Sequence, residues 1–154
     1  MKLLPNSLHD CGILELPKIH NRAGNITALN NLSELPFEVK RIYYLYDIPA
    51  GEGRGGHAHK ELHQLIIAAS GSFEILLKDG ENQKTFTLDQ PYMGLLVVPG
   101  IWREISDFSS GSICLVLASA KYLEHDYIRD YSEYKTLRNI AWKYIHQPMF
   151  NQKK

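Results

Sequence analysis

The sequence predicts an all-β protein, a sandwich or barrel of short antiparallel strands that is followed by one short C-terminal helix. Runs of roughly five to eight residues, rich in β-branched and aromatic side chains, alternate with turns that contain Gly or Pro. Turn signals that recur every ~8–12 residues are typical of this fold class. The expected strands lie at 39–46, 64–69, 73–77, 84–88, 95–98 and 112–118.

Two features predict how these strands form a core. The Asp79-Gly80 pair lies between the runs 73–77 and 84–88 and predicts a β-hairpin, because Asp-Gly suits the tight turns that join neighbouring strands. The apolar runs 64–69 and 112–118 are too short for typical helices. We expect both to be strands buried on two faces at the centre of the core.

The segment from Lys121 onward differs from the rest of the chain. Tyrosines and apolar residues between 127 and 141 recur at roughly helical spacing, which predicts an irregular stretch and then a short helix that ends before Pro148. A tyrosine-rich tail suits a cover over a barrel mouth or a subunit contact. Plain packing against the core is the alternative.

Composition excludes several classes of protein. The 154 residues suit a single domain, which we expect to have its core at about 11–120 and its tail at 121–154. Seventeen Lys and Arg balance seventeen Asp and Glu, which argues against a nucleic-acid partner. No apolar run approaches the ~20 residues that span a membrane. Cys11 and Cys114 lie in no metal-binding spacing, so we expect free thiols in a cytoplasmic protein.

The segment 51–64 is the most informative for chemistry. If it enters a strand near Gly56, His57 and His59 point to the same face, because side chains alternate along a strand. Two imidazoles on one face can bind a metal or transfer protons, although two histidines can also be ordinary surface residues. Four neighbouring glycines allow tight bends and close approach to a ligand, and Arg54 beside them suits a phosphate.

This pattern resembles the cupins, small jelly-roll barrels similar to those of the RmlC-like sugar isomerases. In cupins a His-x-His is followed by Glu, a glycine, and later Pro-x-Gly with another His. Here His57-Ala-His59 and Gly71 fit, whereas Gln64 stands in the Glu position and Trp102, Arg103 or Glu104 in the last His position. Two imidazoles fall short of the three protein ligands usual in a catalytic metal site, with His63 as a conceivable third. We therefore expect acid–base histidines and no metal.

Four motifs carry a closer resemblance, to the cupin-type dTDP-4-keto-6-deoxyglucose 3,4-ketoisomerases and the related WxcM-like proteins of bacterial surface-polysaccharide clusters. The resemblance covers the chain from about residue 11 to 134, and its motifs lie at 41–46, 54–60, 99–104 and 126–131. The resemblance implies an isomerase without a cofactor, a dTDP-linked 4-keto-6-deoxy sugar as substrate, and a homodimer that exchanges N-terminal strands.

Moving a ketone from C4 to C3 through an enediol assigns roles to these residues. One of His57 and His59 is expected to remove the C3 proton while the other relays protons between the oxygens; which does which stays open. Tyr44 and Tyr46 share strand parity and are expected to aim phenols into the barrel, with Tyr43 on the opposite face; lining the core is their alternative.

The remaining candidates are expected to bind substrate. Arginine suits bidentate contacts with phosphate, and Arg54 and Arg103 adjoin the best-matched motifs. Trp102 is expected to stack on thymine or the sugar, or else to be a core tryptophan. The other expected substrate contacts are Arg41, Lys60, Gln64 and Arg22, the last of them in a turn that resembles one in the family.

Three other functions remain open at this point. The same barrel could be a noncatalytic module that binds a sugar nucleotide. It could also be a metal-dependent cupin enzyme, which stoichiometric iron, zinc or manganese in the purified protein would reveal. Epimerisation of dTDP-4-keto sugars at C3 and C5 is the last alternative, although those enzymes resemble this chain less around His-x-His.

Overall fold

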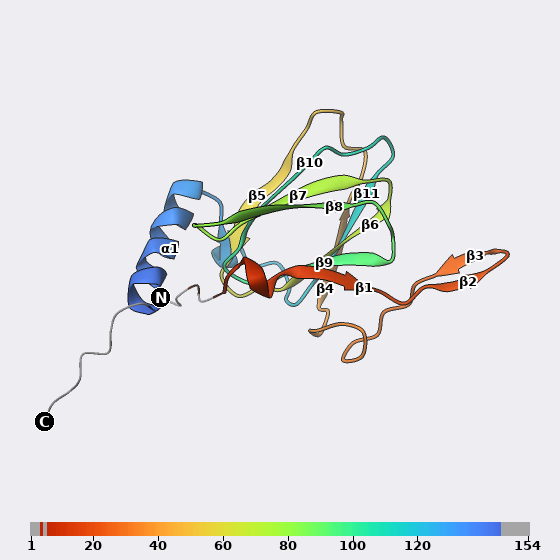
Figure 1. Ribbon diagram of the computed structural model, residues 1–154, viewed down its shortest axis with the longest axis horizontal. Helices are drawn as coiled ribbons and strands as arrows, with labels where there is room; N and C mark the ends of the chain where they lie inside the picture. The colour runs from red at the N-terminus through yellow and green to blue at the C-terminus, as the bar shows by residue number, and fades with distance from the viewer. Residues whose placement is uncertain (1–3, 5, 146–154) are drawn as a thin grey trace, which may run out of the picture.

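The computed structural model describes Leu4 and residues 6–145, which form two facing antiparallel sheets, a projecting hairpin and a helix (Figure 1). In spatial order, the first sheet contains β1 (Gly12–Glu15), β9 (Met93–Val97), β6 (Gln64–Ser70), β11 (Ile113–Ala118) and β4 (Arg41–Leu45). The second contains β12 (Tyr127–Ile128), β5 (Arg54–His59), β10 (Trp102–Ser106), β7 (Phe73–Lys78) and β8 (Gln83–Leu88). The remaining elements are β2 (Ile19–Asn21), β3 (Gly24–Ile26), the 3₁₀ turns Leu8–Asp10 and Glu124–Asp126, and α1 (Tyr131–Ile145). The expected all-β jelly roll with a C-terminal helix is confirmed.

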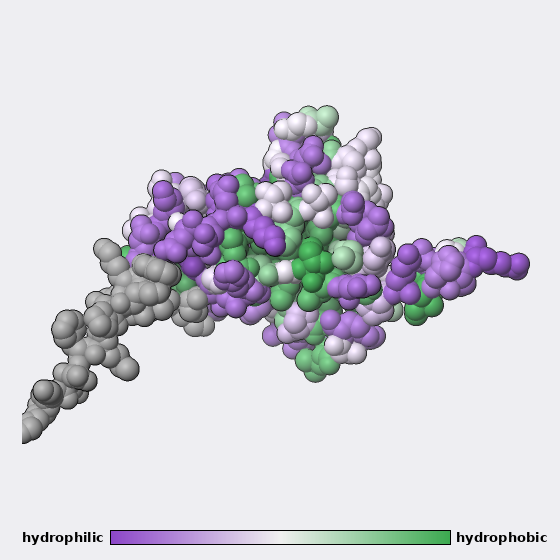
Figure 2. Space-filling view, viewed as in Figure 1, coloured by the Kyte–Doolittle hydropathy of each residue, from purple (hydrophilic) through white to green (hydrophobic). Residues whose placement is uncertain are grey.

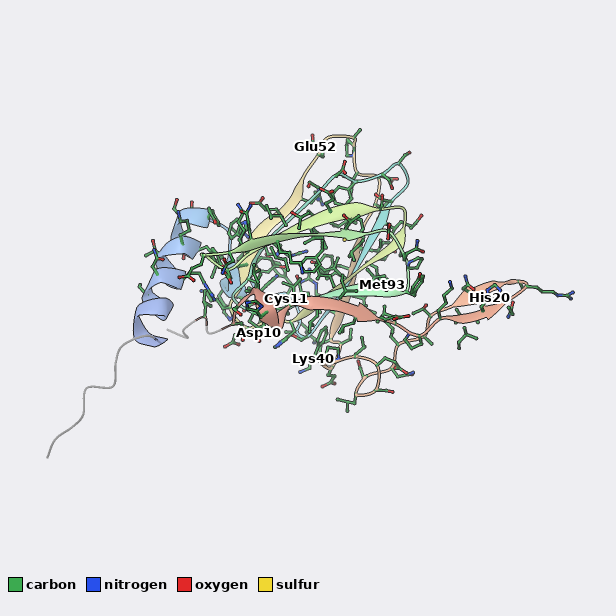
Figure 3. The ribbon with its side chains drawn as sticks, in the orientation of Figure 1. Asp10, Cys11, His20, Lys40, Glu52 and Met93 are labelled. Atoms are coloured by element: carbon green, nitrogen blue, oxygen red, sulfur yellow. The ribbon has the colours of Figure 1, made fainter. Side chains whose placement is uncertain are left out.

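Strand β6 lies at the centre of the first sheet and is buried on both faces, as its apolar run predicts. Ile66 and Ala68 face the space between the sheets and pack in the main core with residues of β7, β9 and β11. Leu65 and Ile67 face the other way, beneath the segment that follows β3. Figure 3 shows side chains filling the space between the sheets.

Two glycine positions explain how neighbouring strands are joined. The predicted hairpin is present: β7 pairs with β8 from Phe73↔Leu88 to Lys78↔Gln83, and Gly80 in its turn has φ +97°. Gly71, the second cupin glycine, joins β6 to β7 with φ +66°. A Cβ at that position would lie 2.9 Å from Ser112, so the turn has no room for a larger residue.

Helix α1 packs against one end of the second sheet. The Tyr134 side chain is fully buried, and its hydroxyl donates to the carbonyls of Lys78 and Gly100 at 2.9 and 2.8 Å. Arg138 donates to the carbonyls of Asp79 and Leu4. The described part of the helix therefore packs on the core, while the predicted stop before Pro148 lies outside the described residues.

The β2–β3 hairpin projects from the opposite end of the molecule, where Figure 3 labels His20. Apolar side chains gather in the middle of the face shown in Figure 2, and hydrophilic ones cover the helix. In the described part of the chain, no helix has the length and apolar character required to cross a membrane. Cys11 is partly buried and Cys114 buried, and both are free thiols.

Candidate active site

The two histidines of β5 point into the space between the sheets and touch each other. Only 7% of His57 and 5% of His59 is exposed. Their Nε2 atoms are 3.1 Å apart, and their rings meet edge to face at 89°. Ala58 between them faces the other side of the sheet and packs with Trp102 and Tyr134. The predicted common face of His57 and His59 is therefore confirmed.

Asp126 lies behind this pair. Its Oδ2 is 2.9 Å from His59 Nδ1, and its Oδ1 accepts a hydrogen bond from the backbone N–H of Glu61. Burial raises the pKa of Asp126, but the hydrogen bonds from His59 and Glu61 outweigh this and lower it. Asp126 is thus an ionised acceptor, which places a hydrogen on His59 Nδ1 and leaves Nε2 as the basic atom of neutral His59.

Three further side chains connect to the histidines from other strands. Arg103 of β10 lies opposite His57 in the sheet and approaches its Nε2 at 3.2 Å. Arg103 also donates to the Tyr43 hydroxyl at 2.9 Å, and Gln64 donates to the same hydroxyl at 3.2 Å. The Gln64 amide is 3.3 Å from His59 Nε2. Strands β4, β5, β6 and β10 therefore meet in one polar cluster.

Both histidines are held in the neutral state. Burial, the Arg103 guanidinium and the neighbouring His59 lower the pKa of His57 to about 2. Burial also lowers the pKa of His59, and the hydrogen bond with Asp126 opposes this. Because Asp126 stabilises a protonated His59, His59 carries a proton more readily than His57 does.

Several buried polar atoms of the cluster have no partner within the described chain. They are Arg103 Nε and Nη1, Arg41 Nη1 and Gln64 Oε1. Arg41 stacks over the rings of Tyr43 and Tyr122, at 4.6 and 5.2 Å from their centres. Buried polar groups without partners are costly, and such donors suit an anionic ligand.

Arg54 is exposed at the start of β5, ahead of the two histidines. It pairs with Ile105, whereas His57 pairs with Arg103, so four residues of β5 (54–57) lie opposite three of β10 (103–105). This bulge places Arg54 on the same face as Ile105, whose side chain points into the core. Of the arginines expected to bind substrate, Arg41, Arg54 and Arg103 therefore share the inward face.

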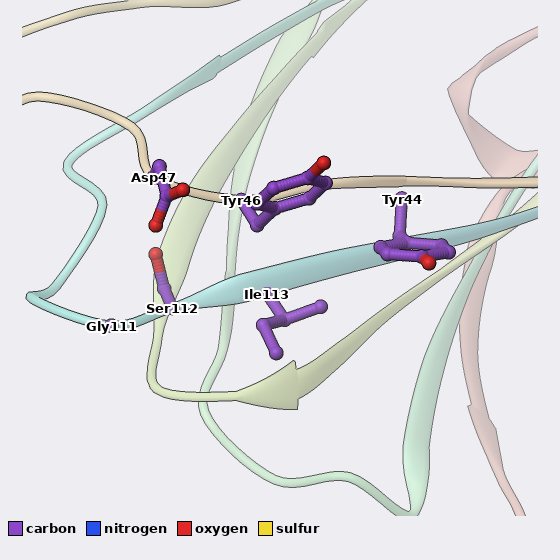
Figure 4. Close-up of a pocket in the computed structure, with 6 residues that line it drawn as sticks. All are labelled: Tyr44, Tyr46, Asp47, Gly111, Ser112 and Ile113. Atoms are coloured by element: carbon purple, nitrogen blue, oxygen red, sulfur yellow. The ribbon is translucent and has the colours of Figure 1, made fainter.

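The expected inward orientation of Tyr44 and Tyr46 was wrong. Tyr44 and Tyr46 are 58% and 61% exposed on the outer face, whereas Tyr43 faces inward. They line a surface pocket of about 440 Å³ with Asp47 and residues 111–113 (Figure 4). The prediction failed because both faces of β4 carry apolar and aromatic side chains, so its alternation does not reveal which face is buried.

Three expected substrate contacts also lie elsewhere. Because Arg103 faces inward, Trp102 faces outward and is buried against Tyr131 and Tyr134, as its core alternative requires. Lys60 alternates away from His59 and donates to the carbonyl of His125. Arg22 lies in the exposed turn of the β2–β3 hairpin, remote from the histidines (Figure 1).

The conceivable third metal ligand, His63, does not join the pair. Its ring lies against Phe37, with 6.1 Å between ring centres. Within the described residues, no three His, Cys, Asp or Glu side chains are arranged to hold a metal ion.

Sequence reasoning missed Tyr43, Asp126 and Tyr127. The Tyr127 ring lies 4.4 Å from that of His59 and 5.0 Å from that of His57. Asp126 and Tyr127 belong to a motif that carries the family resemblance, but Asp126 is 67 residues away from His59. No local spacing could have joined these two residues.

Comparisons with known proteins identify the family of this chain. The family model FdtA, described as WxcM-like, C-terminal, matches residues 9–139. A curated TDP-4-oxo-6-deoxy-alpha-D-glucose-3,4-oxoisomerase from Aneurinibacillus thermoaerophilus is 42% identical over 123 residues, which cover 80% of this chain and 88% of the relative.

Solved structures are also similar. A 3,4-ketoisomerase from Helicobacter canadensis is 48% identical with a TM-score of 0.82, covering 84% of this chain and 98% of that one. A histidine-to-asparagine mutant of the 3,4-ketoisomerase QdtA from Thermoanaerobacterium thermosaccharolyticum, in complex with TDP-4-keto-6-deoxyglucose, is 35% identical with a TM-score of 0.85. That alignment covers 92% of this chain and all of the other. The chain therefore belongs to the FdtA family of WxcM-like proteins, whose solved relatives are sugar 3,4-ketoisomerases.

Proposed function

We propose that this protein is a sugar-nucleotide 3,4-ketoisomerase that moves the keto group of dTDP-4-keto-6-deoxyglucose from C4 to C3, for deoxysugar biosynthesis. The observation that carries the proposal is the contact chain His57–His59–Asp126, which meets Tyr43 and Arg103 on one inward face. The names and substrates of the relatives support the same reaction.

The histidine pair acts as the acid–base unit. The C3–H bond breaks as a histidine takes its proton, and an enediolate forms across C3 and C4. The O3 proton moves to O4, and protonation at C4 completes the isomerisation without any change in overall oxidation state. His59 is the base, because Asp126 stabilises the imidazolium that forms. His57, 3.1 Å away, relays protons.

Tyr43 and Arg103 stabilise the enediolate. The Tyr43 oxygen accepts hydrogen bonds from Arg103 and Gln64, which leaves its own proton free to donate to a substrate oxygen. The unpartnered Nε and Nη1 of Arg103 supply two more donors. This arrangement gives Tyr43 the role that the sequence suggested for Tyr44 and Tyr46.

The diphosphate is held by the remaining inward arginines. Arg41 has a buried nitrogen without a partner in the described chain, and Arg54 lies at the exposed edge of the same face. Guanidinium groups form bidentate contacts with phosphate oxygens.

The working form is a homodimer that exchanges N-terminal strands. Ile42 and Tyr44 of β4 and Tyr46 just after it expose an apolar stripe, and Ile19 and Ile26 expose apolar side chains on the β2–β3 hairpin. A second copy would cover both surfaces. Exchange would carry the Arg22 turn toward the partner subunit. We place the enzyme in the cytoplasm, where both thiols stay reduced.

Incubation with dTDP-4-keto-6-deoxyglucose in deuterated water, followed by NMR of the product, tests this proposal. We expect a 3-keto sugar with deuterium at C4. His59→Asn should abolish turnover while nucleotide affinity stays nearly unchanged, and His20→Asn on the hairpin is the matched control. Binding of the nucleotide sugar without conversion would instead support a noncatalytic module, and dependence on an added metal would support a metal-dependent cupin.

A further inference from the structure

Tyr127 packs against both histidines of the site from the neighbouring strand. Strand β12 pairs with β5 so that Tyr127 lies opposite His59, and side chains that lie opposite each other on one face of a sheet are in contact. The centre of the Tyr127 ring is 4.4 Å from that of His59 and 5.0 Å from that of His57, which lies two positions along the same face. One aromatic ring therefore touches the two imidazoles that the proposed reaction uses.

The two histidines are held in different ways. A histidine ring rotates easily about its last side-chain bond, because that torsion has only broad minima. In His59 both ring nitrogens are engaged, Nδ1 with Asp126 at 2.9 Å and Nε2 with Gln64 at 3.3 Å, and these contacts fix the ring plane. Within the described chain, the hydrogen-bond contacts of His57 are both at Nε2, with His59 and Arg103. The His57 ring can therefore pivot about that atom unless another group packs against it.

The Tyr127 ring is itself held by its neighbours. The guanidinium of Arg129, two residues further along the chain, lies over the Tyr127 ring, 4.2 Å from its centre. Two hydrogen bonds of 2.8 and 3.0 Å fix this guanidinium on the carboxylate of Glu124. The ring of Tyr122 also packs against Tyr127, with 5.4 Å between the ring centres. These contacts restrict the Tyr127 ring, which therefore offers the imidazoles a fixed surface.

We propose that Tyr127 is a positioning residue, whose ring holds the His57 imidazole at the angle from which it relays protons between His59 and the sugar. The inference rests on the proposed function. Proton transfer requires donor and acceptor within hydrogen-bond reach, and a displacement of ~1 Å can cost about 10²-fold in rate. Loss of the ring should therefore slow the chemical step and leave nucleotide binding, which we assign to Arg41 and Arg54, unchanged.

Steady-state kinetics and dTDP affinity of Tyr127 variants test this role. Tyr127→Leu and Tyr127→Met remove the aromatic ring, so each should lower kcat about tenfold or more, while KM and the dissociation constant of dTDP change by less than about threefold. Tyr127→Phe keeps the ring and should retain kcat within about threefold of the wild type. Tyr131→Leu is the matched control, because Tyr131 is also partly buried but packs on the outward-facing Trp102, with 5.0 Å between ring centres. It should keep the wild-type kcat and KM.

Melting temperatures, measured for every variant, restrict the comparison to folded protein, and the methionine variant provides it if the leucine variant does not fold. Wild-type kcat in the folded leucine or methionine variant would overturn the positioning role. An equal loss of kcat in Tyr127→Phe would overturn it too, because the hydroxyl would then act directly on the substrate. A loss of dTDP affinity as large as the loss of kcat would make the ring part of the nucleotide site instead. An inactive wild type would overturn the proposed function.

Discussion

Burial of His57 makes the stability of the fold depend on pH. Burial, Arg103 and His59 lower the pKa of His57 from 6.5 to about 2 in the folded protein. In the unfolded chain the imidazole is in water and regains a pKa near 6.5. Below pH 6.5 the unfolded state therefore binds a proton that the folded state does not. The free energy of unfolding therefore keeps its full value above pH 6.5 as far as His57 is concerned, and it falls progressively as the pH is lowered toward 2.

The size of the effect follows from the two pKa values. At pH 5 the unfolded imidazole is ~1.5 pH units below its pKa, and each unit is worth about 1.4 kcal/mol. His57 alone should therefore lower the free energy of unfolding by about 2 kcal/mol between pH 8 and pH 5. The lowered pKa of His59 acts in the same direction.

Urea unfolding of the wild type, His57→Asn and His20→Asn at pH 8, 6 and 5 measures this dependence. The loss between pH 8 and pH 5 should be about 2 kcal/mol smaller in His57→Asn than in the wild type. His20 is exposed on the hairpin, so His20→Asn should keep the wild-type dependence. An equal loss in His57→Asn and wild type would show that His57 is not held neutral, and the electrostatic account of the site would fail.

Two other predictions concern β4, whose two faces have different roles. Tyr43→Phe removes the inward hydroxyl and should lower kcat by about 10²-fold, while Tyr46→Phe should stay within about twofold in steady-state assays; similar losses in both variants would refute the assignment to Tyr43. Ile42→Asp places a charge on the exposed apolar stripe and should shift the protein from dimer to monomer in sedimentation velocity, whereas Thr87→Asp on β8 should not. A dimer that withstands Ile42→Asp would place the subunit contact elsewhere.

The parts of the fold that could be predicted are those that local physics determines. The buried runs of β6 and β11, the Asp79-Gly80 hairpin and the shared face of His57 and His59 follow from periodicity and turn chemistry. Strands β1, β2 and β3 are only three or four residues long, too short for a periodic pattern to show.

The parts that could not be predicted depend on tertiary contacts. Whether Tyr43 or Tyr44 faces inward is decided by the pairing of β4 with β11, not by any property of β4 alone. Arg103 enters the site because the pairing of β10 with β5 places it opposite His57, and its neighbour Trp102 therefore packs on the other face. Asp126 reaches His59 because β12 pairs with β5, where Tyr127 lies opposite His59.

The two departures from the cupin metal pattern now have a common physical explanation. Gln64 stands in the Glu position of the cupin pattern, and Arg103 is one of the three candidates for its last His position. Each directs an N–H group toward a histidine nitrogen, at 3.3 and 3.2 Å. A nitrogen lone pair that accepts a hydrogen bond is not free to bind a metal, and a guanidinium that never loses its proton repels a second cation nearby. With Gln64 and Arg103 at these positions, Asp126 is the anionic partner of the histidine pair. The residues of this barrel are therefore arranged to move protons, which is what the exchange of a ketone between adjacent carbons requires.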